Sequence, residues 1–274
     1  MVMKHKLAAF LALAIMSVHF AYAQTENTAE QEKDTTIYLK DVIIEENRLS
    51  YSFSEASRNV EIVEKAEIMN TPMQSLPEIL SYQPGVDIRQ RGPLGVQADI
   101  GIRGGSFEQT LVLVNGIKMS DPQTGHHVLN VPLMYDNLER IEILKGSAAR
   151  IYGQNAYAGA VNFITKVPEK NAIRFRGYGG DFGSWGGNLS ASFRNENQGH
   201  YISLGSDISN GYRYNTDYEM INGFYQGKIT LNSNSQIDII AGLTDRKFGA
   251  NGFYASPQAI NQYEEVRTGL ASIG

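Results

Sequence analysis

The sequence predicts an α+β domain over residues 51–168, followed over residues 169–274 by the first five or six strands of an incomplete antiparallel transmembrane β-barrel. Mixed helix and strand patterns end near residue 166, and segments of about ten residues with strict two-residue alternation follow. No stretch after residue 23 approaches the roughly 20 apolar residues of a transmembrane helix. A chain that enters a membrane without such helices must do so as a barrel, because the bilayer leaves no partner for open backbone groups.

The first 23 residues predict a secretory signal peptide. Lys4 and Lys6 lie in a basic start, an uncharged apolar run of 12 residues follows, and residues 21–23 form an Ala-Tyr-Ala cleavage pattern. As a helix, that run spans about 18 Å, against roughly 30 Å of hydrocarbon. A short membrane anchor is the weaker alternative.

Residues 24–50 predict a flexible segment, because most of them are polar or charged. Within this segment, residues 37–46 form a single β-prone island around Val42, Ile43 and Ile44. Two interpretations remain open from the residues alone. The island is either an edge strand or a segment kept loose for capture by a partner's sheet.

The elements of the α+β domain follow from periodicity and turn residues. Pro84-Gly85 ends a helix, and Asn115-Gly116 is a strong hairpin signal between two short strands. A polar loop is expected over residues 120–130. We expect helices at residues 64–69, 75–82 and within 146–152, and strands at residues 60–63, 86–90, 99–104, 110–114, 117–119, 140–144 and 160–166.

Beyond residue 168, five segments carry one apolar and one polar face. The polar faces include Arg, Asp and Lys, which suit a wet lumen. A soluble sandwich is the alternative, although its strands are typically about 5–6 residues long. A sixth segment is expected over residues 263–274, where the sequence stops. Because open strand edges are unstable in a bilayer, we expect a fragment or a truncated gene product. The apolar faces are expected to carry Ile173, Phe175, Leu189, Phe193, Ile202, Leu204, Ile221, Ile229, Ile237 and Leu243.

Composition and motifs exclude several function classes. The absence of cysteine excludes disulfides and thiolate metal sites. The net charge of −5 without a basic stripe argues against nucleic acid as a partner. No Ser/His/Asp grouping and no phosphate loop is recognisable, so the sequence gives no reason to expect an enzyme. His126-His127 suggests a metal, but adjacent histidines point in different directions in an extended chain, and polar contacts are the favoured interpretation.

Four ordered stretches, at residues 75–90, 100–105, 111–119 and 138–166, resemble the plug domain of TonB-dependent outer-membrane receptors. With the barrel start, the resemblance covers roughly residues 37–274. It implies a 22-stranded barrel around the plug, no cofactor, and active import of a scarce ligand across the outer membrane of a Gram-negative bacterium. Three positions depart from the family pattern. They are Asn115 in place of Asp, Ser147 in place of Pro, and Ala158 in place of Gly, which raises the question whether residue 158 needs left-handed backbone.

The resemblance also implies partners. Residues 41–48 stand where the family has its TonB box, which adds as a strand to the sheet edge of TonB, with ExbB and ExbD as the energy source. The expected pairing residues are Asp41, Val42, Ile43, Ile44 and Glu45.

Two arginines match family positions that pair with glutamates of the barrel wall. They are Arg103 and Arg140, and we expect them to act as a plug–barrel latch, since buried charges need partners. The alternative is that each guanidinium reaches solvent.

The resemblance places ligand binding on the outward loops of the plug, at residues 90–97, 120–130 and 152–157. Loop lengths and the tyrosine-rich opening of the barrel resemble the vitamin B12 receptor branch, which makes cobalamin the leading ligand. A ferric-siderophore or other nutrient receptor is the alternative, and a non-transporting adhesin is a remote one. Asp217 and Glu219 stand where that branch carries calcium-binding loops, so calcium remains open. The candidate ligand-binding residues are Gln90, Arg91, Leu94, Gln97, Gln123, His126, His127, Asn130 and Tyr152.

Overall fold

The computed structural model describes residues 43–46, 49–52 and 59–274, except for positions 73, 122, 167, 168 and 255. The predicted signal peptide and most of the predicted flexible segment, including Asp41 and Val42, therefore lie outside the described residues. None of the helices in the described part of the chain has the length and hydropathy of a membrane-spanning helix.

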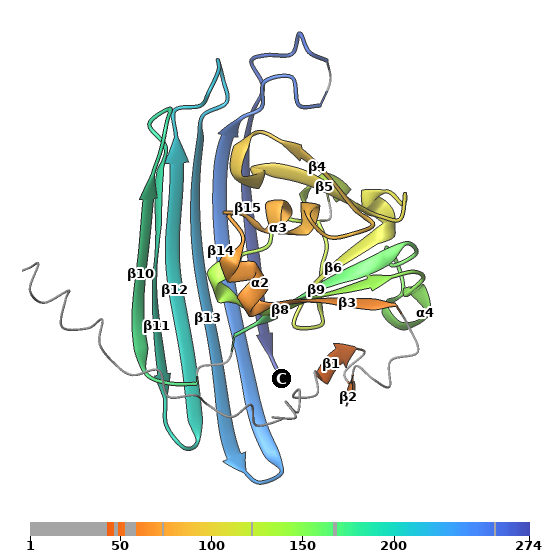
Figure 1. Cartoon of the computed structure of the whole chain (residues 1–274), viewed down its shortest axis with the longest axis vertical. Coiled ribbons are helices and arrows are strands. Elements are labelled where there is room, and N and C mark those ends of the chain that lie inside the picture. Colours follow the sequence, from red (N-terminus) through yellow and green to blue (C-terminus); the bar gives the residue numbers. More distant parts are fainter. Residues whose placement is uncertain are drawn as a thin grey trace, which may run out of the picture. The chain divides into compact units, whose positions relative to one another are not determined.

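The α+β domain is built on a mixed five-stranded sheet and a separate two-stranded sheet (Figure 1). In the larger sheet β6 and β9 are parallel, and all other neighbours are antiparallel. The larger sheet has the order β3 (Val60–Glu64), β8 (Leu138–Lys145), β9 (Gly159–Thr165), β6 (Thr110–Val114), β7 (Ile117–Met119), and the smaller one pairs β4 (Val86–Arg91) with β5 (Gln97–Ile102). The helices are α2 (Lys65–Asn70), α3 (Leu76–Ser81) and α4 (Ala149–Tyr152).

Local sequence explains where α3 and the β6–β7 hairpin form. Ser75 caps α3 reciprocally with Glu78, because the Ser75 hydroxyl accepts from the Glu78 N–H and the Glu78 carboxylate accepts from the Ser75 N–H. Asn115 and Gly116 both have positive φ, 47° and 78°, as a two-residue type I′ turn requires. These two predictions are confirmed.

The predicted strand at residues 99–104 is wrong at both ends. The observed strand, β5, begins at Gln97 and ends at Ile102. Arg103 and Gly104 have φ values of 50° and 81°, so the backbone leaves the extended region there and turns. The left-handed conformation of an arginine is not visible in the residue pattern, which explains the error.

The second part of the chain is an antiparallel six-stranded sheet in sequence order, which confirms the predicted barrel strands. Its long strands lie side by side in Figure 1. Two of them have 15 residues each, longer than the predicted ten. The strands are β10 (Ala172–Gly179), β11 (Trp185–Arg194), β12 (Gln198–Ser209), β13 (Tyr218–Asn232), β14 (Ser235–Gly249) and β15 (Tyr263–Ile273).

The two faces of this sheet differ as the alternation predicts. On the outer face, large apolar side chains are exposed, with Ile173 and Phe175 at 79% and 78%. On the inner face, polar side chains are buried. One apolar and one polar face is the arrangement that lipid on one side and a polar lumen on the other require. The buried polar residues of this face include Asn188, Ser190, Ser203, Asp207, Asn222, Gln226 and Thr244.

The α+β domain packs against the polar inner face. Tyr201, Phe224 and Ile240 of the sheet belong to the same hydrophobic core cluster as Leu133 and Phe163 of the domain. Three short polar contacts add to this packing. Arg176 Nη2 lies 2.6 Å from Asp136 Oδ2, Asn137 Nδ2 donates to Ser203 Oγ at 2.6 Å, and the Thr165 hydroxyl donates to Gln226 Oε1 at 2.6 Å. The domain is therefore fixed to the wall through both apolar and polar contacts.

Ala158 needs no left-handed backbone, because it is not among the residues with positive φ. Its methyl group instead lies against Gly105, where an added Cβ would come within 2.3 Å of it. The substitution therefore carries no backbone strain.

Replacing Gly159 with alanine is expected to destabilise the α+β domain. A Cβ at Gly159 would lie 2.3 Å from the backbone oxygen of Leu144 and 2.8 Å from Ile102. Overpacking of this kind typically costs about 1–3 kcal/mol. The control is Gly269→Ala in β15, where a Cβ meets nothing within 4 Å. Chemical unfolding of the full-length protein measures both, and equal effects of the two substitutions would contradict the close approach at Gly159.

Candidate functional site

The loop between β4 and β5 is held against the barrel strands. Gly92 and Leu94 have positive φ values of 75° and 51°, which fold the loop back on itself. Leu94 and Val96 then pack into an apolar cluster of the sheet and of the loop after β14. In Figure 1, β4 and β5 lie beside the upper parts of β14 and β15. The sheet residues of this cluster are Tyr218, Met220 and Phe248, and its loop residues include Ala250 and Phe253.

Four side chains meet above this contact, and we call Arg91, Asp99, His126 and Tyr254 the apical cluster. Asp99 is at its centre. His126 Nδ1 lies 2.7 Å from Asp99 Oδ1, and Arg91 Nη2 lies 3.5 Å from Asp99 Oδ2. Because a carboxylate only accepts, the His126 Nδ1 carries the shared proton. The Arg91 guanidinium lies 5.2 Å from the centre of the Tyr254 ring.

Gln97 forms hydrogen bonds to two residues of this cluster. It is fully buried, and its Nε2 donates to Asp99 Oδ1 at 2.8 Å and to the His126 carbonyl at 3.0 Å. Two buried atoms here have no hydrogen-bond partner among the described residues, Arg91 Nη1 and Gln97 Oε1. A buried donor or acceptor without a partner is costly, so these atoms are suited to a polar ligand or a bound water.

Tyr254 and His127 connect the plug loop to the start of β15. The Tyr254 hydroxyl donates to Glu264 Oε2 at 3.0 Å, and His127 Nε2 lies 3.6 Å from the same oxygen. Burial, and then the Glu264 carboxylate, raise the pKa of Tyr254 above its ordinary value. The phenol therefore stays protonated and acts as a donor.

Asn130 ties the second plug loop to β14. Its Oδ1 accepts from Arg246 Nη1 at 3.0 Å, and both side chains are buried. Sequence reasoning missed Tyr254, Glu264 and Arg246 as members of this site. Residues 245–257 comprise the end of β14 and part of the loop after it, and periodicity does not indicate which of their side chains turn toward the plug.

Three other predicted ligand residues lie elsewhere or point outward. Gln90 is exposed and donates to the Gly92 carbonyl at 3.1 Å. Gln123 is exposed, in a turn held by the Asp121 carboxylate. Tyr152 belongs to a different hydrophobic cluster, which contains Leu113 and lies at the α4 side of the domain. The structure thus gathers Arg91, Leu94, Gln97, His126, His127 and Asn130, and separates Tyr152 from them.

Replacing Asp99 with asparagine is expected to loosen the loop of residues 120–130. The change removes the charge that holds Arg91 and His126, and hydrogen bonds to charged groups contribute about 1.5–3 kcal/mol. Amide hydrogen exchange in this loop should accelerate by about tenfold or more. The control is Asp87→Asn on β4, whose side chain is 56% exposed and pairs with exposed Arg89. Unchanged exchange in the Asp99 variant would contradict the central role of this carboxylate.

The two predicted latch arginines differ in their surroundings. Arg103 is exposed, and among the described residues its guanidinium forms no ion pair. Arg140 is mostly buried on β8, where its Nη2 lies 2.7 Å from Glu142 Oε1. The plug itself therefore supplies a partner for Arg140. Pairing of either arginine with a wall glutamate stays a prediction.

Part of the predicted TonB box is described. Ile43, Ile44 and Glu45 lie in β1 (Ile43–Glu46), which pairs antiparallel with β2 (Leu49–Ser52). The segment is thus extended, with a short partner strand that the sequence pattern did not indicate.

Asp217 and Glu219, the pair considered for calcium, are both exposed at the start of β13. Among the residues that the structure describes, no group of three or more His, Asp or Glu side chains is placed to hold a metal ion. Calcium binding by this pair stays a prediction.

Residues 52–160 match the family model described as TonB-dependent Receptor Plug Domain. Among curated proteins, the vitamin B12 transporter BtuB of Vibrio cholerae is 35% identical over 163 residues, which is 59% of this chain and 25% of the relative. A vitamin B12 transporter BtuB of Vibrio vulnificus is 29% identical over 77% of this chain and 33% of its own length. The chain thus spans about a quarter to a third of the curated relatives it matches.

Solved structures share the fold at lower identity. The Pseudomonas aeruginosa receptor FpvA, bound to a pyoverdine–iron complex, superposes with a TM-score of 0.65 and 16% identity, over 84% of this chain and 33% of the receptor. The siderophore receptor PirA of Pseudomonas aeruginosa gives a TM-score of 0.53 and 24% identity, over 71% of this chain and 35% of PirA. At these identities the likeness concerns the fold alone.

Proposed function

We infer that this chain belongs to the TonB-dependent outer-membrane receptors, and from that premise we propose that the full-length protein imports a scarce ligand across the outer membrane of a Gram-negative bacterium. The observation that carries the proposal is the α+β domain packed on the polar face of a sheet whose opposite face exposes apolar side chains. A domain in that position would close a wide barrel, and only wide barrels need closing. Export would use residues 1–23 as a signal peptide.

Energy for import would come from TonB, driven by ExbB and ExbD. The segment around Ile43 and Ile44 is extended, which suits addition to the edge of a TonB sheet through backbone hydrogen bonds. Capture would first have to replace the pairing of β1 with β2. An adhesin would make no use of this segment.

Cobalamin is the proposed ligand. The support comes from the vitamin B12 transporters among the curated relatives, which match 59% and 77% of this chain. The apical cluster and the adjacent pair of His127 and Glu264 also fit a large ligand without a strong net charge, since Arg91 lies near Asp99 and His127 lies near Glu264. A ferric siderophore is the second candidate, because the structures that share this fold include siderophore receptors.

Equilibrium binding to the purified full-length protein separates these ligands. We expect saturable binding of cyanocobalamin and no saturable binding of a ferric hydroxamate or catecholate. Tyr254→Ala should weaken cobalamin binding by about tenfold, as expected for losing about 1.4 kcal/mol of aromatic and hydrogen-bonding contact. Arg89→Ala, an exposed change on β4, is the control. Saturable binding of the siderophore alone would contradict cobalamin as the ligand and leave import standing.

A further inference from the structure

A second polar pocket lies between the plug and the first barrel strands, away from the apical cluster. It encloses about 410 Å³ of space outside protein atoms, part of it open to solvent. Its lining comes from the start of α2, the residues after β9, and strands β10 to β12. Four of the nine lining residues are Lys or Arg, and one is a carboxylate. The four cations are Lys65, Lys166, Lys170 and Arg174.

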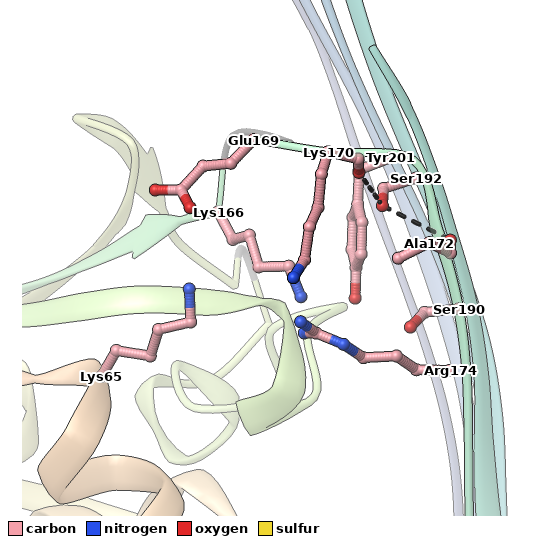
Figure 2. A pocket seen from close by; sticks show the side chains of 9 residues that line it. All are labelled: Lys65, Lys166, Glu169, Lys170, Ala172, Arg174, Ser190, Ser192 and Tyr201. Carbon is pink, nitrogen blue, oxygen red and sulfur yellow. Dashed lines mark hydrogen bonds between the residues drawn. The ribbon is translucent and has the colours of Figure 1, made fainter.

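Three of these cations converge, and the carboxylates that act on the pKa of Lys166, Asp136 and Glu139, have weaker effects on it than burial, Arg174 and Lys65. Figure 2 shows the amines of Lys166 and Lys170 and the guanidinium of Arg174 pointing toward one another beside the Tyr201 ring. Among the described residues, none of the three forms an ion pair, whereas Lys65 lies 2.7 Å from Glu139. The Glu169 side chain points away from the three head groups in Figure 2.

Burial of Lys166 raises the free energy of holding these like charges close together. Lys166 is 9% exposed, and its Nζ lies 4.8 Å from the centre of the Tyr201 ring. Burial, followed by the charges of Arg174 and Lys65, lowers the pKa of Lys166 to about 8. Like charges at close range repel one another, and an anion among them would turn that repulsion into attraction.

The donors in the pocket suit an anion with several acceptor oxygens. Two ammonium groups and a guanidinium offer many N–H donors in different directions, and the buried Ser190 hydroxyl faces the same space. A phosphate group accepts from several donors at once, whereas a carboxylate has only two oxygens. The Ser192 hydroxyl is already used, because it donates to the Lys170 carbonyl at 2.8 Å and so holds that lysine's backbone in place.

We propose that this pocket binds a phosphate group, which Lys166, Lys170 and Arg174 hold between the plug and the barrel wall. The group would come from inorganic phosphate or from a phospholipid headgroup. This inference is independent of the imported ligand, because none of its residues belongs to the apical cluster. A bound phosphate would join the residues after β9 to the wall at β10.

The test is titration of the full-length protein, in a detergent with an uncharged headgroup, with inorganic phosphate, short-chain phosphatidylglycerol, and acetate. We expect saturable binding of a phosphate compound and much weaker binding of acetate. The double variant K170Q/R174Q changes only exposed side chains, so it should fold, and it should weaken phosphate binding by about tenfold or more. The matched control K228Q/K247Q also removes two positive charges from barrel strands, where Lys228 pairs with Asp238 and Lys247 with Glu265. This control should bind phosphate with wild-type affinity.

Tighter binding of the lipid than of inorganic phosphate would support the proposal with a headgroup as the source. Equal or weaker lipid binding would support it with free phosphate as the source. The proposal is overturned if neither phosphate compound binds saturably to the wild-type protein. It is also overturned if K170Q/R174Q binds both with wild-type affinity, or if acetate binds as tightly as phosphate.

Discussion

Deleting residues 41–46 from the full-length protein is expected to reduce ligand uptake to the level of cells that lack TonB, while ligand binding stays unchanged. The reason is that backbone pairing with TonB needs an extended segment, and the described part of this run, Ile43–Glu46, is extended. Uptake of radiolabelled ligand by whole cells, together with equilibrium binding to the purified receptor, measures the two effects separately.

Two controls sharpen this experiment. Deleting residues 26–31 removes the same length from the same polar segment and should leave uptake intact. Ile43→Pro removes a backbone N–H donor and should reduce uptake strongly, whereas Ile43→Ala keeps the donor and should have little effect. Uptake that survives deletion of residues 41–46 would show that import is not coupled through this segment.

Replacing Arg140 with methionine is expected to lower the free energy of unfolding of the plug by about 3 kcal/mol. The buried Glu142 carboxylate accepts from Arg140 Nε at 2.8 Å, and Asn162 Nδ2 also donates to it at 3.3 Å. Removing one partner of a buried ion pair leaves a charge that is poorly compensated, which costs about 3–5 kcal/mol. Chemical unfolding of the full-length protein measures the change.

A double-mutant cycle identifies the partner that matters. If Glu142 is that partner, Arg140→Met and Glu142→Gln should couple by about 1–3 kcal/mol. If a wall glutamate holds Arg140 instead, the coupling with Glu142 should be close to zero. Arg89→Met is the control, because its ion pair with Asp87 is exposed and should contribute less than about 1 kcal/mol.

Helices, hairpins and strand faces were predictable because neighbouring residues in the sequence determine them. Pro84-Gly85 predicts the end of α3, Asn115-Gly116 predicts its hairpin, and two-residue alternation predicts which side chains of the barrel strands face outward. The alternation also assigns buried polar residues such as Asn222 to the inner face, because strand geometry fixes the side.

Contacts between distant segments were not predictable. Arg246 and Asn130 are 116 positions apart, and Arg176 and Asp136 are 40 apart. Their pairing depends on how the plug is placed against the wall, which no single segment encodes. The end of β5 was missed for a different reason, because the left-handed backbone of Arg103 is stabilised by the fold around it, including a bond from its N–H to the Gly85 carbonyl at 2.8 Å.

The residues in and around the apical cluster include some that the sequence identifies and one that it does not. His126, His127 and Asn130 could be named because they lie in a polar loop between predicted strands. Tyr254 could not be named, although it contacts both Arg91 and Glu264. A tyrosine in a loop after a barrel strand has many environments open to it, and only the tertiary structure selects one.

Uptake of radiolabelled cyanocobalamin, by cells in which the full-length protein is the only cobalamin receptor, distinguishes TonB-coupled import from passive entry. Import by a plugged, TonB-coupled receptor predicts saturable uptake that falls to background when TonB is removed, while binding to the cell surface persists. Uptake that continues at the same rate without TonB, or rises linearly with concentration as through an open pore, would contradict the account.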